Sequence, residues 1–195
     1  MAEWLSALGT IGAVALAFLV VLFEEPLRHL GQRRATAEIV ECSQIEQKYS
    51  KRKQIKSRFK IKNKGCFTDT IKVDVMKIIG RQDFIEVPLV WLHGRVMGED
   101  APTVKEIGPR QSAWVDLATV DTEWAEDHGL FLYLDLGVQW RSANLELLDP
   151  GKTALLLRIH PRYAKPAYYL ATIDWDGTYS KPSITYRKSN SPTLA

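Results

Sequence analysis

The sequence predicts an all-β protein: an antiparallel β-sandwich of about 7–9 short strands, preceded by one N-terminal transmembrane α-helix. Residues 4–23 contain no charged side chain, whereas apolar residues recur at every second position in several later segments. The first pattern is typical of a membrane span, and the second is typical of strands with one buried face. We expect a helix in residues 1–25, a basic connector in 26–35, the sandwich in 36–179 and a flexible polar tail in 180–195.

Length and composition suit one globular domain behind this N-terminal segment. The chain has 195 residues, of which 46% are hydrophobic and 25% charged, and these values are ordinary for a folded protein. Its net charge of +3 is small, so the distribution of charge matters more than the sum. Cys42 and Cys66 are too few to staple a secreted scaffold, and we expect free thiols. A disulfide between them would require an oxidising compartment.

The uncharged segment runs from Trp4 to Phe23 and is polar only at Ser6 and Thr10. A helix of this length covers roughly 30 Å, the thickness of a bilayer's hydrocarbon core. A cleavable signal peptide would have basic residues before the apolar run and a small-residue cleavage site after it. Here two glutamates and Pro26 follow instead. The sequence therefore predicts a permanent anchor.

Flanking charges predict the orientation of the anchor. No Lys or Arg precedes it, while Arg28, Arg33 and Arg34 follow it. Basic residues near the ends of a span favour the cytoplasmic side. We therefore expect a single-pass protein of the cell membrane, with its N-terminus outside and its β-sandwich in the cytoplasm. The same three arginines are expected to contact anionic lipid headgroups.

Small residues recur on one face of the predicted helix. Gly9, Ala13 and Ala17 are spaced four residues apart. Small residues allow helices to approach closely in a bilayer, so this stripe predicts helix association and a homo-oligomer. The alternative is that small residues are simply common in transmembrane helices.

The clearest strand pattern lies between residues 55 and 62, where apolar or small residues alternate with basic ones. Further alternation occurs in residues 71–75 and 130–140, and β-branched or aromatic residues are enriched around 39, 87–92, 113–117, 154–159 and 168–175. Turn-forming sequences separate these segments, including Asn63-Lys64-Gly65, Gly108-Pro109 and Asp149-Pro150-Gly151. Residues 121–127 are the only helical candidate in the domain, with Asp121 or Thr122 as its N-terminal cap.

The segment containing Phe59, Ile61, Asn63 and Gly65, followed by a strand near Ile71, resembles the strand, Asn-x-Gly turn, strand pattern of bacterial immunoglobulin-like and fibronectin-III-like sandwiches. The sequence Asp149-Pro150-Gly151 before residues 154–159 is similar to their late edge. This resemblance implies an immunoglobulin-like sandwich, as in small prokaryotic membrane proteins with one N-terminal helix. The Cys…Trp…Cys spacing of true immunoglobulin domains is missing, and the resemblance implies no activity.

No motif in the sequence indicates a particular reaction. Gly151-Lys152-Thr153 resembles the end of a phosphate-binding loop, but Glu146 stands where that loop needs glycine. The four histidines lack metal-ligand spacing, and neither cysteine belongs to a CxxC pair. We therefore predict a protein that is not an enzyme, with no catalytic residues, metal site or cofactor.

Basic residues are concentrated between residues 48 and 64. Alternate residues on one strand face would form a ladder about 7 Å apart. We predict an anion- or partner-binding face made of Lys51, Arg52, Lys53, Lys56, Arg58, Lys60, Lys62 and Lys64. Its candidate ligands are phospholipid, an acidic protein and, less favoured because aromatic residues are few, nucleic acid. The alternative is a solvated face balanced by Asp69, Asp74 or acids of a neighbouring strand.

An acidic cluster around Trp124 provides a contrasting surface, which could meet the basic face of a neighbouring copy in an oligomer; the alternative is an exposed, capped turn. It comprises Asp116, Asp121, Glu123, Glu126 and Asp127. Among the other tryptophans, Trp140 is expected in the core, while the exposure of Trp91, Trp114 and Trp175 is left open.

These observations predict a membrane-anchored binding or scaffold protein with a cytoplasmic β-sandwich. One alternative is an extracytoplasmic carbohydrate- or envelope-binding module, which requires the reverse orientation. Another is a signal-gated membrane effector that acts through oligomerised transmembrane helices.

Overall fold

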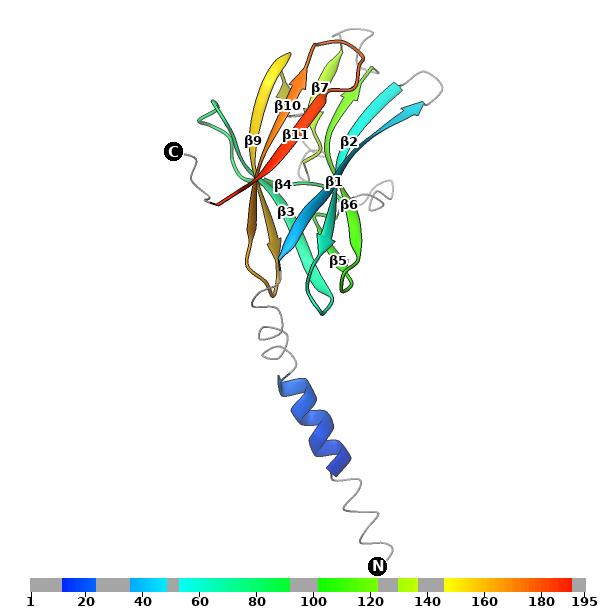
Figure 1. Ribbon diagram of the computed structural model, residues 1–195, viewed down its shortest axis with the longest axis vertical. Coiled ribbons are helices and arrows are strands. Elements are labelled where there is room, and N and C mark those ends of the chain that lie inside the picture. Colours follow the sequence, from blue (N-terminus) through cyan, green and yellow to red (C-terminus); the bar gives the residue numbers. More distant parts are fainter. Residues whose placement is uncertain are drawn as a thin grey trace, which may run out of the picture.

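The computed structural model describes residues 12–23, 36–48, 53–91, 102–122, 130–136 and 146–190 (Figure 1). Residues 12–23 form a helix, and the later residues form two antiparallel β-sheets. Within the described ranges, no helix combines the length and apolar character that crossing a membrane requires. Residues 4–11 of the predicted span and the connector at 26–35 lie outside these ranges.

Within the described residues, eleven strands make up the two sheets, and all named pairs are antiparallel. The first sheet contains, in spatial order, β1 (Ala37–Lys48), β2 (Lys53–Asn63), β6 (Ser112–Asp121), β7 (Phe131–Leu134) and β8 (Leu147–Leu148). The second contains β11 (Ser183–Ser189), β10 (Ala167–Trp175), β9 (Gly151–Pro161), β3 (Asp69–Ile78) and β4 (Val87–Pro88), with β5 (Val104–Ile107) also paired to β3. The prediction of an all-β sandwich is confirmed.

The chain crosses repeatedly between the two sheets. It passes from β2 to β3, returns from β5 to β6, and crosses again from β8 to β9. As a result, the central pairs β2–β6 and β3–β9 join segments far apart in sequence. The registers also bring the turns β2–β3, β5–β6 and β9–β10 to the same end of the sandwich, where β1 begins.

One hydrophobic core lies between the sheets. On β2, Ile55, Phe59 and Ile61 are buried, whereas Lys56 and the other basic residues between them are only half-buried. The second sheet contributes the alternate residues of β3, β9 and β10 to the same cluster. The two-residue period read from the sequence therefore separates core from surface as expected.

Two features of the fold differ from the prediction. Ser183–Ser189, expected in a tail, forms the edge strand β11, because Ile184 and Tyr186 pack against the core while Thr185 and Arg187 between them are exposed. The strand number also exceeds the predicted 7–9. The additional strands include β5 and β8, which are four and two residues long and too short to produce a recognisable alternation.

Smaller differences concern the segments around residues 121 and 130–140. Asp121 is the last residue of β6 instead of a helix cap, and residues 123–127 of the expected helix lie outside the described ranges. The strand expected over residues 130–140 corresponds to β7, which is followed by an isolated bridge between Leu136 and Leu89. Trp91 and Trp175 are buried in the core, whereas Trp114 is half-buried.

Candidate functional site

The predicted basic face lies on the outer side of β2. Lys56, Arg58, Lys60 and Lys62 alternate with core residues and share this side of the first sheet. Lys53 begins the strand, Lys64 follows it, and Lys51 and Arg52 lie outside the described residues. The ladder arrangement is therefore as expected from the alternation, while its role in binding stays a prediction.

Acidic residues on both neighbouring strands lie close to this basic face. Lys60 Nζ is 3.1 Å from Glu41 Oε2 of β1, and Lys64 Nζ is 2.6 Å from Glu38 Oε1. On the other side, Asp116 of β6 is the register partner of Arg58. Asp69 and Asp74, the other acids considered from sequence, belong to β3 in the second sheet. Within the ladder, Lys60 is thus paired with an acid of β1, and Arg58 lies opposite an acid of β6.

Trp114 on β6 forms an aromatic platform beside the ladder. The Arg58 guanidinium carbon lies 4.6 Å from its ring centroid, and Lys60 Nζ lies 5.3 Å from it. Both distances are within the range of cation–π attraction. These contacts hold the two basic side chains over the sheet and reduce their freedom to reach a separate ligand.

Polar side chains near the start of β2 and the ends of β6 and β7 are buried although they lie on the outer side of the first sheet. Gln54 Nε2 donates to Asp121 Oδ2 at 2.6 Å, and Thr119 Oγ1 donates to Asp135 Oδ2 at 2.6 Å. Hydrogen bonds of this kind offset the cost of burying polar groups. The sequence predicts an exposed acidic surface that includes Asp121, and it does not predict this buried cluster. Alternation indicates the side of the sheet on which a residue lies, but not whether other segments cover that side.

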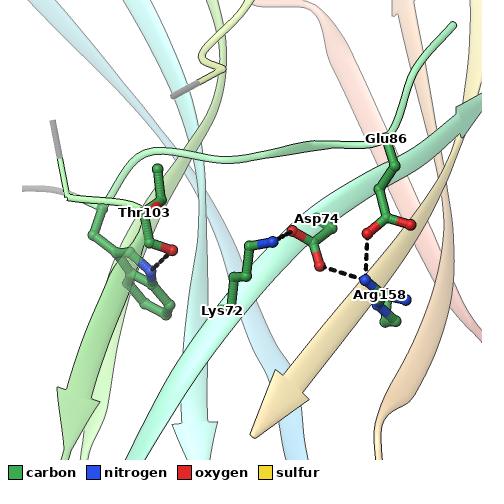
Figure 2. A network of polar contacts seen from close by, with 6 residues as sticks. Lys72, Asp74, Glu86, Thr103 and Arg158 are labelled. Carbon is green, nitrogen blue, oxygen red and sulfur yellow. Dashed lines mark hydrogen bonds and ion pairs between the residues drawn. The ribbon is translucent and has the colours of Figure 1, made fainter. Parts of the chain in front are cut away.

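Figure 2 shows another polar cluster, on the outer side of the second sheet. Asp74 of β3 is buried between Lys72, whose Nζ lies 2.8 Å from Oδ1, and Arg158 of β9, whose Nη2 lies 2.9 Å from Oδ2. Arg158 also forms an ion pair with Glu86, which immediately precedes β4. Breaking one member of such a buried set leaves an uncompensated charge, so this network fixes the β3–β4 connection against the sheet.

Two buried polar residues join the turns at the end where β1 begins. Asn63 donates from Nδ2 to the carbonyl oxygens of Phe67 at 2.8 Å and Ile107 at 2.9 Å, and its Oδ1 accepts from Gly65 N–H at 2.7 Å. This explains the Asn-x-Gly signal read from the sequence: the side chain closes an Asx turn and also binds the β5–β6 region.

Asp69 performs the same task for the third turn at this end. Its carboxylate accepts the backbone N–H of Arg162 at 2.9 Å and of Tyr163 at 3.3 Å. Burial raises the pKa of Asp69, while these backbone hydrogen bonds act in the opposite direction. The turns β2–β3, β5–β6 and β9–β10 are therefore tied together through Asn63 and Asp69.

Both cysteines are thiols without a disulfide, as expected. Cys66 is exposed in the β2–β3 turn, whereas Cys42 of β1 is half-buried against the core. Burial, with a smaller effect of the neighbouring Glu41 charge, raises the pKa of Cys42 to about 11. Since the thiolate is the reactive form, Cys66 is the thiol open to modification at neutral pH.

The predicted association stripe and interfacial arginines are only partly within the described chain. Ala13 and Ala17 are exposed on the helix of residues 12–23, and Gly9 lies outside the described ranges. Arg28, Arg33 and Arg34 lie outside them as well. Helix association and lipid contact by these arginines stay predictions.

No protein-family model matches the chain, and no curated protein and no solved structure matches it either. Within the part of the chain that the structure describes, no group of three or more His, Cys, Asp or Glu residues is arranged to hold a metal ion. Function is therefore inferred from the residues of this chain alone.

Proposed function

We propose that the protein is a membrane-anchored binding protein, in which an N-terminal helix holds a β-sandwich without catalytic activity at a lipid bilayer. The observation that carries this proposal is the helix of residues 12–23, where every residue is exposed and none is charged. Its large apolar side chains expose between 51% and 73% of their surface; they are Val14, Leu16, Phe18, Leu19, Val20, Val21, Leu22 and Phe23.

The hydrophobic effect favours moving such a helix out of water. Covering one Val, Leu or Phe side chain contributes about 1.5–3 kcal/mol, so this set favours an apolar environment by on the order of 10 kcal/mol. A helix that packs on a domain presents one apolar stripe, whereas apolar residues surround this helix on all sides. A lipid environment covers all sides at once, and a helix satisfies its own backbone hydrogen bonds there.

The architecture of the domain supports a separate module behind this anchor. Strands of both sheets bury one continuous core. The central pairs β2–β6 and β3–β9, joined by crossings between the sheets, support the finer assignment of an immunoglobulin-like sandwich. Gln54 and Asp121, Thr119 and Asp135, and Asp74 and Arg158 contact each other directly, which supports structural roles for these polar clusters.

In this proposal the sandwich faces the cytoplasm, because Arg28, Arg33 and Arg34 follow the span. Copies associate through the stripe of Gly9, Ala13 and Ala17, two of which are exposed on the described helix. An acidic protein is the favoured partner class for the basic face of β2.

Reconstitution of the full-length protein tests the anchor. We expect it to float with zwitterionic phosphatidylcholine vesicles and to stay with them after washing at high salt and alkaline pH. Phe18→Asp combined with Val21→Asp places two charges in the apolar helix and should abolish flotation. Lys152→Asp, an exposed position in the sandwich, is the matched control and should float normally. Recovery of the wild-type protein without the vesicles would overturn the proposal.

A reporter enzyme that is active only outside the cytoplasm, fused to the C-terminus, tests the orientation. We expect no reporter activity. Strong activity would favour the extracytoplasmic carbohydrate-binding alternative. The burial of Trp91 and Trp175 weighs against that alternative, because neither ring is available to stack on a sugar.

A further inference from the structure

Basic residues gather on the turns at one end of the sandwich. The connections of residues 64–68, 108–111 and 162–166 contain four cations and no acid: Lys64, Arg110, Arg162 and Lys165. We call this region the basic end. The described connections at the opposite end, residues 79–86, 149–150 and 176–182, contain two cations and four acids. The domain is therefore electrically asymmetric along its strands.

The basic end is built as one surface. Asn63 binds the β2–β3 turn to the end of β5, and Asp69 binds the β9–β10 turn to the start of β3. The backbone N–H of Asn63 also donates to Gln111 O at 3.0 Å, at the start of β6. All four basic side chains lie on exposed residues of these joined turns. These four cations therefore lie on one joined surface.

Aromatic side chains accompany the charges. Phe67 exposes 39% of its surface in the β2–β3 turn, and the Arg162 guanidinium lies 5.1 Å from the ring centroid of the half-buried Tyr163. Exposed aromatic residues beside Lys and Arg are characteristic of surfaces at the membrane–water boundary.

The backbone of Arg110 gives an independent indication that its side chain is required. Arg110 has φ +58° in the turn closed by the Gln111 N–H to Gly108 O hydrogen bond of 3.1 Å. Glycine is favoured at such a position, and a bulky residue there is strained. Strained residues of this kind cluster where function needs the side chain.

We propose that the basic end docks on anionic lipid headgroups of the same membrane that holds the helix; this inference rests on the proposed anchor. Lipid is the occupant because β1 starts here, with Thr36 O accepting the Lys64 N–H at 3.2 Å, so the chain from the helix enters the domain at this end. Two acids compete with lipid for these cations: Glu38, which pairs with Lys64, and Asp69, whose charge acts on Arg162. Docking would hold the strands upright at the membrane.

The native Cys66 in this end provides the test. Full-length protein is labelled at Cys66 with an environment-sensitive maleimide dye and reconstituted in phosphatidylcholine vesicles with and without 30% phosphatidylserine. We expect a blue shift of the emission only with phosphatidylserine, and its loss in 0.5 M NaCl because salt screens the attraction. Replacing Lys64, Arg110, Arg162 and Lys165 with Gln should reduce the phosphatidylserine preference at least about tenfold.

The matched control replaces Lys53, Lys77, Lys152 and Lys181, which are exposed near the opposite end, with Gln and should keep the shift. Circular dichroism checks that both variants fold. Equal emission in the two vesicle types, or loss of the shift in the control variant, would overturn docking even if the protein floats with both. The same shift produced by an oligonucleotide without vesicles would overturn lipid as the occupant. Failure to float with phosphatidylcholine, with the shift on phosphatidylserine intact, would overturn the anchor alone.

Discussion

Asp69 joins two turns of the basic end, and burial in the fold shifts the pKa of its carboxyl group. Burial raises its pKa above the ordinary value of 3.8, with the backbone N–H groups of Tyr163 and Arg162 acting against this. A carboxyl group with a higher pKa in the folded state binds its proton more tightly when folded. Its contribution to stability therefore falls as pH rises from the ordinary pKa through the raised one.

The variant Asp69→Asn removes this titration and isolates its effect. We expect the free energy of unfolding of the wild type, relative to the variant, to increase as pH falls from 7 towards 4. Urea denaturation of both proteins at several pH values measures the difference. A difference that decreases on acidification would contradict the assignment, because it would mean that folding lowers the pKa of Asp69.

Arg110 combines backbone strain with a position on the basic end. Arg110→Gly relieves the φ of +58° and should raise the free energy of unfolding by about 0.5–1 kcal/mol. The same change removes one cation and should weaken the preference for anionic vesicles. Arg162→Gln, which removes a cation of the same end without this strain, is the control and should gain no stability. Loss of stability in Arg110→Gly would show that its backbone is not strained.

At the level of elements, β11 is the strand most open to a direct test. Tyr186 lies edge-on to Phe59 at a centroid distance of 5.3 Å, and Gln44 Nε2 donates to Pro182 O at 2.6 Å. Deleting residues 180–195 should therefore lower stability by about 2–4 kcal/mol, which shifts the Tm downward by about 5–15 °C.

The single variants Tyr186→Ala and Thr185→Ala separate the contribution of core packing by β11 from that of its exposed side. Tyr186→Ala should account for a large part of the loss, whereas Thr185→Ala, on the exposed side, should leave the Tm nearly unchanged. Thermal unfolding followed by circular dichroism measures all three. A truncated protein with the wild-type Tm would mean that β11 adds nothing to the core.

Local patterns explain which elements were predictable. β2 alternates over its whole length, so its core face and its outer face followed from the sequence. The existence of β11 did not follow from the sequence. Exposed Arg187 and Lys188 follow each other and Pro182 precedes the strand, so the segment resembles a polar tail. The β4 and β8 strands are two residues long and exist only through their partners β3 and β7.

The basic end shows the limit of sequence reasoning for the whole molecule. The basic residues between 48 and 64 are conspicuous because they are clustered in the sequence, yet two of them, Lys60 and Lys64, are paired with acids of β1. Lys64, Arg110, Arg162 and Lys165 come from three separate turns, and only strand register brings them together. Register depends on pairings between distant segments, which alternation alone does not specify.

The two sheets share one core, so we expect the domain to unfold as one unit. Trp91 and Trp175 both lie in that core and report its packing, while far-UV circular dichroism reports the strands. In urea the two signals should change with the same midpoint, as in a two-state transition. Separate midpoints would show that one sheet persists without the other.

The crossing of the chain between sheets also sets an order of events during synthesis. β3 is central in its sheet, but its long partner β9 ends only at Pro161. The ribosome adds about 5–20 residues per second, so this partner follows the helix of residues 12–23 after about 7–30 s. If the helix is the proposed anchor, it is therefore synthesised and open to membrane targeting well before the sandwich can close, and the domain completes its fold after that step.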